Sequence, residues 1–193
     1  RVMKKLLGIL VLGLLLITPS QADDIRDFEI EGMSVGDSLL NFVNKSEIIK
    51  NKDFKHTNKK YFQYIYLDKK DSKYDFFQFA IMDKDKNYTI EGVAAGIYFN
   101  NNIKDCLKKI DEVIKDVSNS FPNLKKTKKK ERKHRGDPSG KTIITEVYYN
   151  FNAGDVIALQ CIDYSKEINY IDQLSIQIGS AKYYDWLSYE AFN

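Results

Sequence analysis

Residues 103–121 read IKDCLKKIDEVIKDVSNSF, and this stretch decides the fold. Its apolar side chains recur at intervals of three and four residues, which places them on one face of an α-helix. These side chains are Ile103, Cys106, Leu107, Ile110, Val113, Ile114, Val117 and Phe121. Pro122 ends the pattern, because a proline cannot continue a helix. We therefore expect an amphipathic helix that packs on a core.

Runs dense in Tyr, Phe and Ile lie on both sides of this helix and predict β-strands. Three runs precede the helix and three follow it. The predicted strands are residues 61–67, 75–82, 88–99, 142–151, 155–164 and 170–178. Within the last run, residues 173–178 (QLSIQI) alternate polar and apolar side chains, which predicts a sheet with one solvated face.

Three shorter segments also read as helical: residues 35–43, with Ser34 as the N-cap, residues 46–49 and residues 181–192. The order is then helix, three strands, helix, three strands, helix. We predict a single α+β domain over residues 23–193, built as an antiparallel sheet of about five to seven strands with two main helices packed on one face. Two helix-plus-three-strand units would give this order.

Residues 1–22 have the three parts of a secretory signal peptide. Lys4 and Lys5 precede a 12-residue apolar run at 6–17, and Ser20-Gln21-Ala22 supplies small residues for cleavage. A membrane anchor is the alternative, but a spanning helix needs about 20 apolar residues. We expect cleavage after Ala22, a periplasmic or secreted protein, and no transmembrane segment in the mature chain.

The two cysteines of the chain are Cys106 and Cys161. Cys106 lies on the apolar face of the predicted helix, and Cys161 shares a strand face with Ile157 and Leu159. An exported protein meets an oxidising compartment, where disulfides form and persist. We predict a Cys106–Cys161 disulfide that joins the helix to the sheet, with two separate buried thiols as the alternative.

Charge is unevenly distributed along the mature chain. The whole sequence carries +3, and the three cations of residues 1–22 account for it, so residues 23–193 are formally neutral. Residues 125–135 carry eight cations and one acid, which leaves −7 on the rest. The cations are Lys125, Lys126, Lys128, Lys129, Lys130, Arg132, Lys133 and Arg135. Residues 123–140 show no apolar periodicity, so we expect a basic loop there.

This basic segment suggests contact with a polyanion or an anionic membrane surface, and an envelope protein is another candidate partner. The alternative is a solvated, flexible loop, since the whole chain is rich in lysine, 26 residues against 4 arginines. Nucleic acid is not expected as a partner, because no aromatic residues interleave with the cations and the chain is exported.

Two short motifs resemble ligand loops without meeting their requirements. Residues 136–142 (GDPSGKT) place three residues between the glycines where a phosphate loop needs four, and a strand follows, so we expect a turn. Asp83, Asp85 and Asn87 have calcium-loop spacing, but Tyr88 replaces the required glycine and Ala94 the required glutamate. We expect a solvated hairpin tip there.

Catalytic and cofactor signals are weak. His56 and His134 lie in polar and basic stretches, where we expect them to be exposed. With two histidines and two cysteines, a standard four-ligand zinc site is not expected. We assign no catalytic residue, no metal and no cofactor from the sequence.

Several stretches carry a family resemblance. Residues 31–40 (EGMSVGDSLL), 161–166 (CIDYSK), Lys141-Thr142 and Trp186-Leu187 resemble uncharacterised secreted proteins from AT-rich marine bacteria of the SAR11 type. That resemblance brings no function with it. Gly32-Met33-Ser34 is similar to the start of the first helix in SmpA/OmlA-type (BamE-like) domains, which implies a small periplasmic domain.

The sequence therefore favours a secreted or periplasmic protein that serves as a non-catalytic binding or structural module. The alternative is a small envelope hydrolase whose carboxylates meet only in the folded chain. A flat sheet face or a groove lined by exposed Tyr and Phe would favour the binder. A cleft with converging carboxylates or a strongly perturbed titratable group would favour the hydrolase.

Overall fold

The computed structural model describes residues 24–66, 71–100 and 102–193. The expected signal peptide, residues 1–22, lies outside the described residues. Among the helices that are described, none is both long enough and apolar enough to cross a bilayer.

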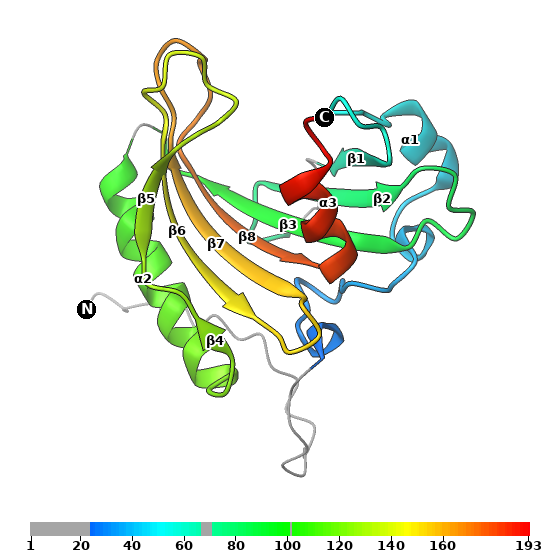
Figure 1. Ribbon diagram of the computed structural model, residues 1–193, viewed down its shortest axis with the longest axis horizontal. Helices are drawn as coiled ribbons and strands as arrows, with labels where there is room; N and C mark the ends of the chain where they lie inside the picture. The colour runs from blue at the N-terminus through cyan, green and yellow to red at the C-terminus, as the bar shows by residue number, and fades with distance from the viewer. Residues whose placement is uncertain (1–23, 67–70, 101) are drawn as a thin grey trace.

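One antiparallel sheet organises the described chain (Figure 1). Its strands are β1 (Tyr61–Tyr66), β2 (Phe76–Met82), β3 (Ile90–Tyr98), β4 (Lys125–Lys126), β5 (Lys130–Lys133), β6 (Ile143–Asn150), β7 (Val156–Asp163) and β8 (Gln173–Gly179). The order is β1-β2-β3-β8-β7-β6-β4, and β5 also pairs with β6. The predicted α+β class with an antiparallel sheet is confirmed, and all six predicted strands form.

The sheet consists of two meanders, β1-β2-β3 and β6-β7-β8. They join where β3 pairs with β8, with Gly92 opposite Gly179 and Ala94 opposite Gln177. The repeated strand order of the sequence therefore corresponds to two three-strand units that share one continuous sheet.

The basic segment is not a loop throughout. Within residues 123–140, β4 and β5 form at the sheet edge and pair with β6, with Lys130 opposite Glu146 and Arg132 opposite Ile144. The prediction of a loop is therefore wrong for the residues of β4 and β5, and these two strands add to the six that were predicted. Lys and Arg side chains give no apolar alternation, while the backbone of β6 supplies the pairing partners.

Helix α2 (Ile103–Ser120) confirms the helix predicted from the spacing of its apolar residues. It covers β7 and β8, and its buried face consists of Cys106, Ile110, Val113 and Val117. Burying a large aliphatic side chain of this kind contributes about 1.5–3 kcal/mol. The face of the sheet under α2 is called the helix face here, and the opposite one the groove face.

The disulfide predicted from the sequence is present. Cys106 on α2 and Cys161 on β7 are joined, with Cα atoms 5.9 Å apart and a separation of 55 positions in the sequence. Both cysteines are fully buried. The bond ties α2 to the middle of the sheet.

The N-terminal segment covers the β1–β3 half of the helix face. It contains η1 (Ile25–Asp27), η2 (Leu39–Asn41) and α1 (Lys45–Lys50). The α-helix expected at 35–43 is only the 3-10 turn η2, because nearby backbone groups bond elsewhere. Leu39 N–H donates to the carbonyl of Tyr88, and Ile90 N–H donates to that of Asp37. Leu39 is nevertheless fully buried, as its apolar spacing predicted.

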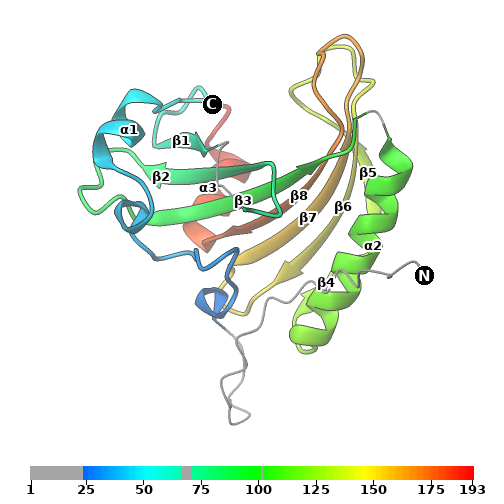
Figure 2. The same cartoon turned by 180° about the vertical axis from the view of Figure 1, so that it is seen from behind.

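Helix α3 (Ala181–Tyr189) lies on the groove face, opposite α2. Figure 1 shows α3 in front of the sheet, and Figure 2 shows α2 in front when the molecule is seen from behind. The expectation that two main helices share one face is therefore not confirmed. Tyr183 and Tyr184 of α3 lie over Gly92 and Gly179, where the sheet has no side chains.

Candidate functional site

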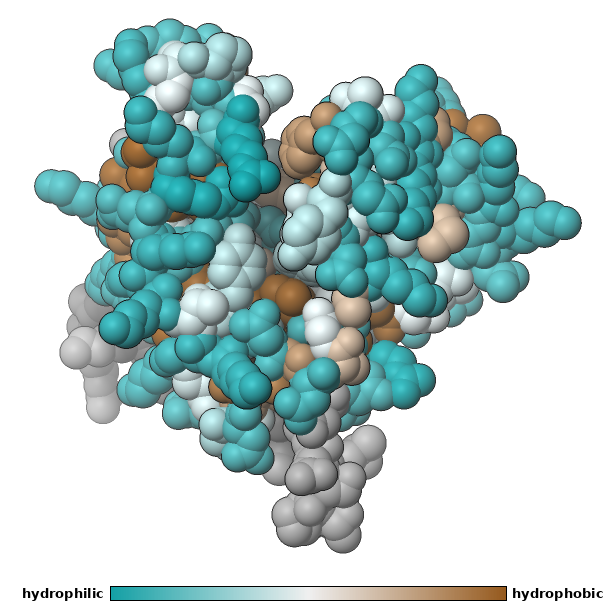
Figure 3. Space-filling view, viewed as in Figure 1, coloured by the Kyte–Doolittle hydropathy of each residue, from teal (hydrophilic) through white to brown (hydrophobic). Residues whose placement is uncertain are grey.

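The groove face carries a hollow of about 320 Å³, called the groove below (Figure 3). Tyr183, Tyr184 and Leu187 of α3 line one end of it. His134 and Tyr164 line it where the β5–β6 and β7–β8 connections begin. A volume of 320 Å³ is at the small end of the range for ligand pockets, which suits a small molecule.

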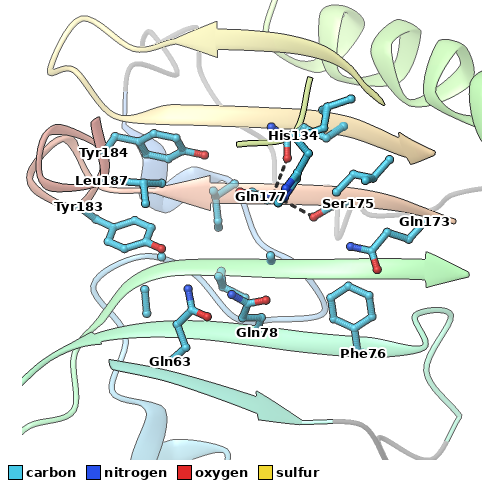
Figure 4. Close-up of a pocket in the computed structure, with 18 of the residues that line it drawn as sticks. Gln63, Phe76, Gln78, His134, Gln173, Ser175, Gln177, Tyr183, Tyr184 and Leu187 are labelled. Atoms are coloured by element: carbon cyan, nitrogen blue, oxygen red, sulfur yellow. Dashed lines mark hydrogen bonds between the residues drawn. The ribbon is translucent and has the colours of Figure 1, made fainter. Parts of the chain in front are cut away.

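Every glutamine in the described part of the chain lines the groove (Figure 4). The five are Gln63, Gln78, Gln160, Gln173 and Gln177. No asparagine lies among the described residues that line it. Side chains alternate between the faces of a strand, so glutamines flanked by buried apolar residues all point to the face opposite α2.

Cross-strand register brings these amides together. Gln78 on β2 and Gln177 on β8 both lie opposite Ala94 of β3, whose small side chain leaves space between them. Gln160 on β7 lies opposite Ser175 of β8. The floor is therefore a set of amide groups around a shallow centre.

Three of these polar side chains form a ladder of hydrogen bonds. Gln177 Nε2 donates to Gln160 Oε1 at 3.0 Å and to Ser175 Oγ at 3.1 Å. Gln160 Nε2 in turn donates to Glu146 Oε2 at 3.0 Å. The ladder thus ends on a carboxylate.

Glu146 is almost fully buried, and its partners satisfy it. Its carboxylate accepts from Arg132 Nε at 3.0 Å and from the Tyr148 hydroxyl at 2.8 Å, and Lys130 Nζ lies 3.5 Å away. A buried carboxylate is tolerated only when it is paired and hydrogen-bonded. Glu146 does not line the groove itself, but Arg132, Tyr148 and Gln160 do.

Aromatic rings form much of the groove wall, and glycines make room for them. A Cβ atom at position 96 would lie 2.0 Å from the Phe76 ring, and one at position 179 would lie 2.6 Å from the Tyr184 ring. Gly92 and Gly96 therefore allow close packing of aromatic rings on the sheet. Phe76 also contacts Tyr98 with ring centroids 5.4 Å apart.

Apart from Arg132, the groove has no charged side chain among the described residues that line it. Burial raises the pKa of Tyr164 and that of Tyr183 to about 12, so both phenols keep their protons. Glu146 neutralises Arg132. The described lining is therefore polar, and its one cation is paired with a buried carboxylate that it shares with Lys130.

Both histidines also line the groove, contrary to the expectation that they are exposed. Burial lowers the pKa of His56, and burial together with Arg132 lowers that of His134. His134 Nδ1 accepts from the N–H of Gly136 at 3.0 Å, which leaves Nε2 as the protonated nitrogen of the neutral ring. Their polar neighbours in sequence did not reveal this burial.

Carboxylates do not converge in the groove, because no Asp or Glu lies among its described lining residues. Burial and nearby Asp172 raise the pKa of Asp163. Asp163 follows Cys161 at the end of β7 and so points to the helix face, away from the groove. The geometry required for a carboxylate-based hydrolase is not seen at this site.

The cations of residues 125–135 are spread over both sides of the sheet edge. Lys130 and Arg132 pair with Glu146, while Lys129 pairs with Asp111 of α2 at 2.7 Å. The others make no ion pair with the described residues; they are Lys125, Lys126, Lys128, Lys133 and Arg135. From the sequence, all eight cations were predicted to form one contact surface, but three of them form ion pairs within the fold.

The two rejected motifs are turns, as expected. Asp137 accepts hydrogen bonds from the N–H groups of Ser139 and Thr142, each at 2.8 Å, and so closes the turn before β6. Asp85 accepts from Asn87 N–H at 3.0 Å and Thr89 N–H at 2.7 Å in the β2–β3 hairpin.

Comparisons with protein-family models, with curated proteins and with solved structures find no match to this chain.

Proposed function

We propose that this protein is an exported, non-catalytic binding module that takes a small polar ligand in the groove. The observation that carries the proposal is the gathering of all five described glutamines on one face, around a hollow walled by aromatic rings. A solvated sheet face also carries polar side chains, but here the amides and the aromatic rings line one hollow. The signal-like segment and the disulfide support export.

Preorganisation also supports a binding role. Gln160 and Gln177 are held by the ladder on Glu146, so they lose little freedom when a ligand arrives. The side-chain amide of Gln78 makes no hydrogen bond to the described residues, so it remains for a ligand. The lack of converging carboxylates in the described lining favours this reading over the envelope hydrolase.

The test is a groove-filling variant. Ala94 lines the floor between Gln78 and Gln177, so Ala94→Phe would occupy the space. Asn119→Phe adds the same ring at an exposed position of α2 and serves as the control. The probes are neutral disaccharides, digalacturonic acid and alanylalanine, and the readout is the thermal midpoint.

At least one probe should raise the midpoint of the wild type and of Asn119→Phe but not of Ala94→Phe. Equal shifts in all three proteins, or no shift with any probe, would overturn the groove as the binding site. Mass spectrometry of the same mixtures would reveal cleaved probes, which would overturn the non-catalytic assignment.

A second candidate function is weak attraction of the basic edge to an anionic surface. It is supported by the five cations that make no ion pair within the described chain and by the −7 charge of the remaining mature chain. This role concerns another part of the molecule and would act beside the groove.

A further inference from the structure

The direction of the amide ladder determines what the groove offers to a ligand. An ionised carboxylate only accepts hydrogen bonds, so Glu146 obliges Gln160 to present its NH₂ group. The oxygen of Gln160 then accepts from Gln177 Nε2 at 3.0 Å. Gln177 Oε1 consequently remains an acceptor for something outside the ladder, and Gln78 beside it offers both a donor and an acceptor.

An apolar ligand does not suit this floor. Covering the amide oxygens of Gln177 and Gln78 without new hydrogen bonds would leave buried polar groups unsatisfied, which is costly. A ligand that only accepts hydrogen bonds could bond the donor of Gln78 but would leave Gln177 Oε1 without a hydrogen-bond donor. The floor requires a ligand whose neighbouring groups both donate and accept, as hydroxyl groups do.

A charged ligand does not suit it either. Arg132 is the single cation among the described lining residues, and it is paired with Glu146. Lys130 shares that carboxylate but is exposed to solvent and does not line the groove. The described lining has no free carboxylate. Both histidines have lowered pKa values and are largely neutral at pH 7. Among the described lining residues, no unpaired charge is left to compensate a desolvated ligand ion.

The walls add a third requirement. The rings of Phe76 and Tyr164 line the groove at the end toward the hairpin connections, and those of Tyr183 and Tyr184 line it at α3. Aromatic faces favour flat apolar surfaces. A pyranose ring combines an apolar C–H face with hydroxyl groups around its rim, and so meets all three requirements.

From these three requirements, which rest on the proposed function of the groove, we infer that its ligand is an uncharged saccharide unit. Gln177 Oε1 accepts from a sugar hydroxyl, and the Gln78 amide bonds a neighbouring one. Glu146 is a positioning residue that sets the direction of the ladder and cancels the charge of Arg132.

The test is calorimetric titration of the mature chain with maltose, cellobiose and N,N′-diacetylchitobiose as neutral probes, digalacturonic acid as the anionic probe and alanylalanine as the peptide probe. At least one neutral disaccharide should bind, and digalacturonic acid and alanylalanine should bind more weakly or not at all. Gln177→Leu should weaken neutral binding about three- to tenfold, the value of one ordinary hydrogen bond. Asn119→Phe should leave it unchanged.

Glu146→Gln has a distinct signature. With its counter-charge gone, Arg132 should raise the affinity for digalacturonic acid relative to the neutral disaccharides, an effect that a merely structural role would not produce. If this variant does not fold by circular dichroism, Gln177→Leu provides the decisive comparison.

The outcomes separate the ligand class from the groove itself. Groove-dependent binding of alanylalanine or digalacturonic acid without any neutral disaccharide would overturn the saccharide and leave the groove as a binding site. If a neutral disaccharide bound with the same affinity to Ala94→Phe, to Gln177→Leu and to the wild type, this result would show that the sugar binds outside the groove. No binding of any probe would overturn both.

Discussion

Gly96 shows at the residue scale how a missing side chain shapes the groove. The ring of Phe76 occupies the space where a Cβ at position 96 would be, at 2.0 Å. Phe76 is directly opposite Gly96 in the register of β2 and β3. The glycine therefore fixes the ring as part of the wall.

We expect Gly96→Ala to destabilise the fold by about 1–3 kcal/mol, the usual cost of overpacking, because the ring must move. Urea unfolding measures this. In a Phe76→Ala background the same substitution should cost much less, since the clash is gone. Strictly additive costs in this double-mutant cycle would show that the two residues do not interact.

Asp137 gives a pH-dependent contribution. Hydrogen bonds from Thr142 and Ser139 lower the pKa of this carboxyl in the folded protein, below the value of about 3.9 in an unfolded chain. Its contribution is therefore present above about pH 4 and is lost as the pH falls toward the folded pKa.

We expect Asp137→Ala to be less stable than the wild type at pH 7, with the gap narrowing as the pH falls below about 4. Thermal unfolding of both proteins across this range measures it. A gap that stays constant down to about pH 2 would contradict the assigned role of the carboxylate.

The sequence carried part of this residue-scale picture. Cys106 and Cys161 were predictable as a pair, because each lies on an apolar face and no other cysteine is present. For the glutamines, the sequence indicated only that residues 173–178, with Gln173 and Gln177, have one solvated face. Their convergence depends on cross-strand register, and register between β2, β3 and β8 cannot be read from any one strand.

At the scale of elements, α2 could be predicted from the spacing of its apolar residues, because these residues form its buried face. The segment at 35–43 has similar spacing, but its backbone bonds to β3, so tertiary pairing overrides the helical pattern. The strands β4 and β5 left no sequence signal, since they pair through their backbone at the edge of β6.

The Cys106–Cys161 bond should account for a large part of the stability of the α2 layer. Closing a loop of 55 residues stabilises by roughly 4 kcal/mol in the chain-entropy model. We expect the Cys106→Ala, Cys161→Ala double variant to lose a comparable amount in urea unfolding. Reduced wild type is the control, and an unchanged midpoint in both would contradict this role.

The basic edge should give salt-sensitive binding to vesicles of phosphatidylglycerol. We expect the wild type to co-sediment at low ionic strength and to be released near 0.15 M salt, where screening shortens to about 8 Å. Replacing Lys125, Lys128, Lys133 and Arg135 with Gln should abolish binding.

The matched control replaces four exposed lysines elsewhere with Gln: Lys50, Lys84, Lys86 and Lys182. This control should retain most of the binding, because the charge change is the same but the location differs. Equal losses of vesicle binding in both variants would show that net charge, and not the basic edge, causes the binding. If the wild type does not bind at low salt, the basic edge has no such role.

At the scale of the whole molecule, the sheet divides the protein into a stability face and a binding face. The helix face holds α2, the disulfide and the N-terminal segment, which together bury the main core. The groove face carries α3 at one end (Figure 1), and the hollow lined by the amides lies beside that helix (Figure 3). The sequence predicted the two-faced sheet, but not that the second face gathers every described glutamine.

The most direct measurement uses this segregation. Selective ¹⁵N labelling of glutamine reports the side-chain amides of the five described glutamines, all of which line the groove. On titration with maltose, cellobiose and N,N′-diacetylchitobiose, we expect at least one sugar to shift the Gln78 and Gln177 amide signals in the wild type and to leave them unshifted in Ala94→Phe. If none of these sugars moves either signal in the wild type, the groove is not a saccharide site.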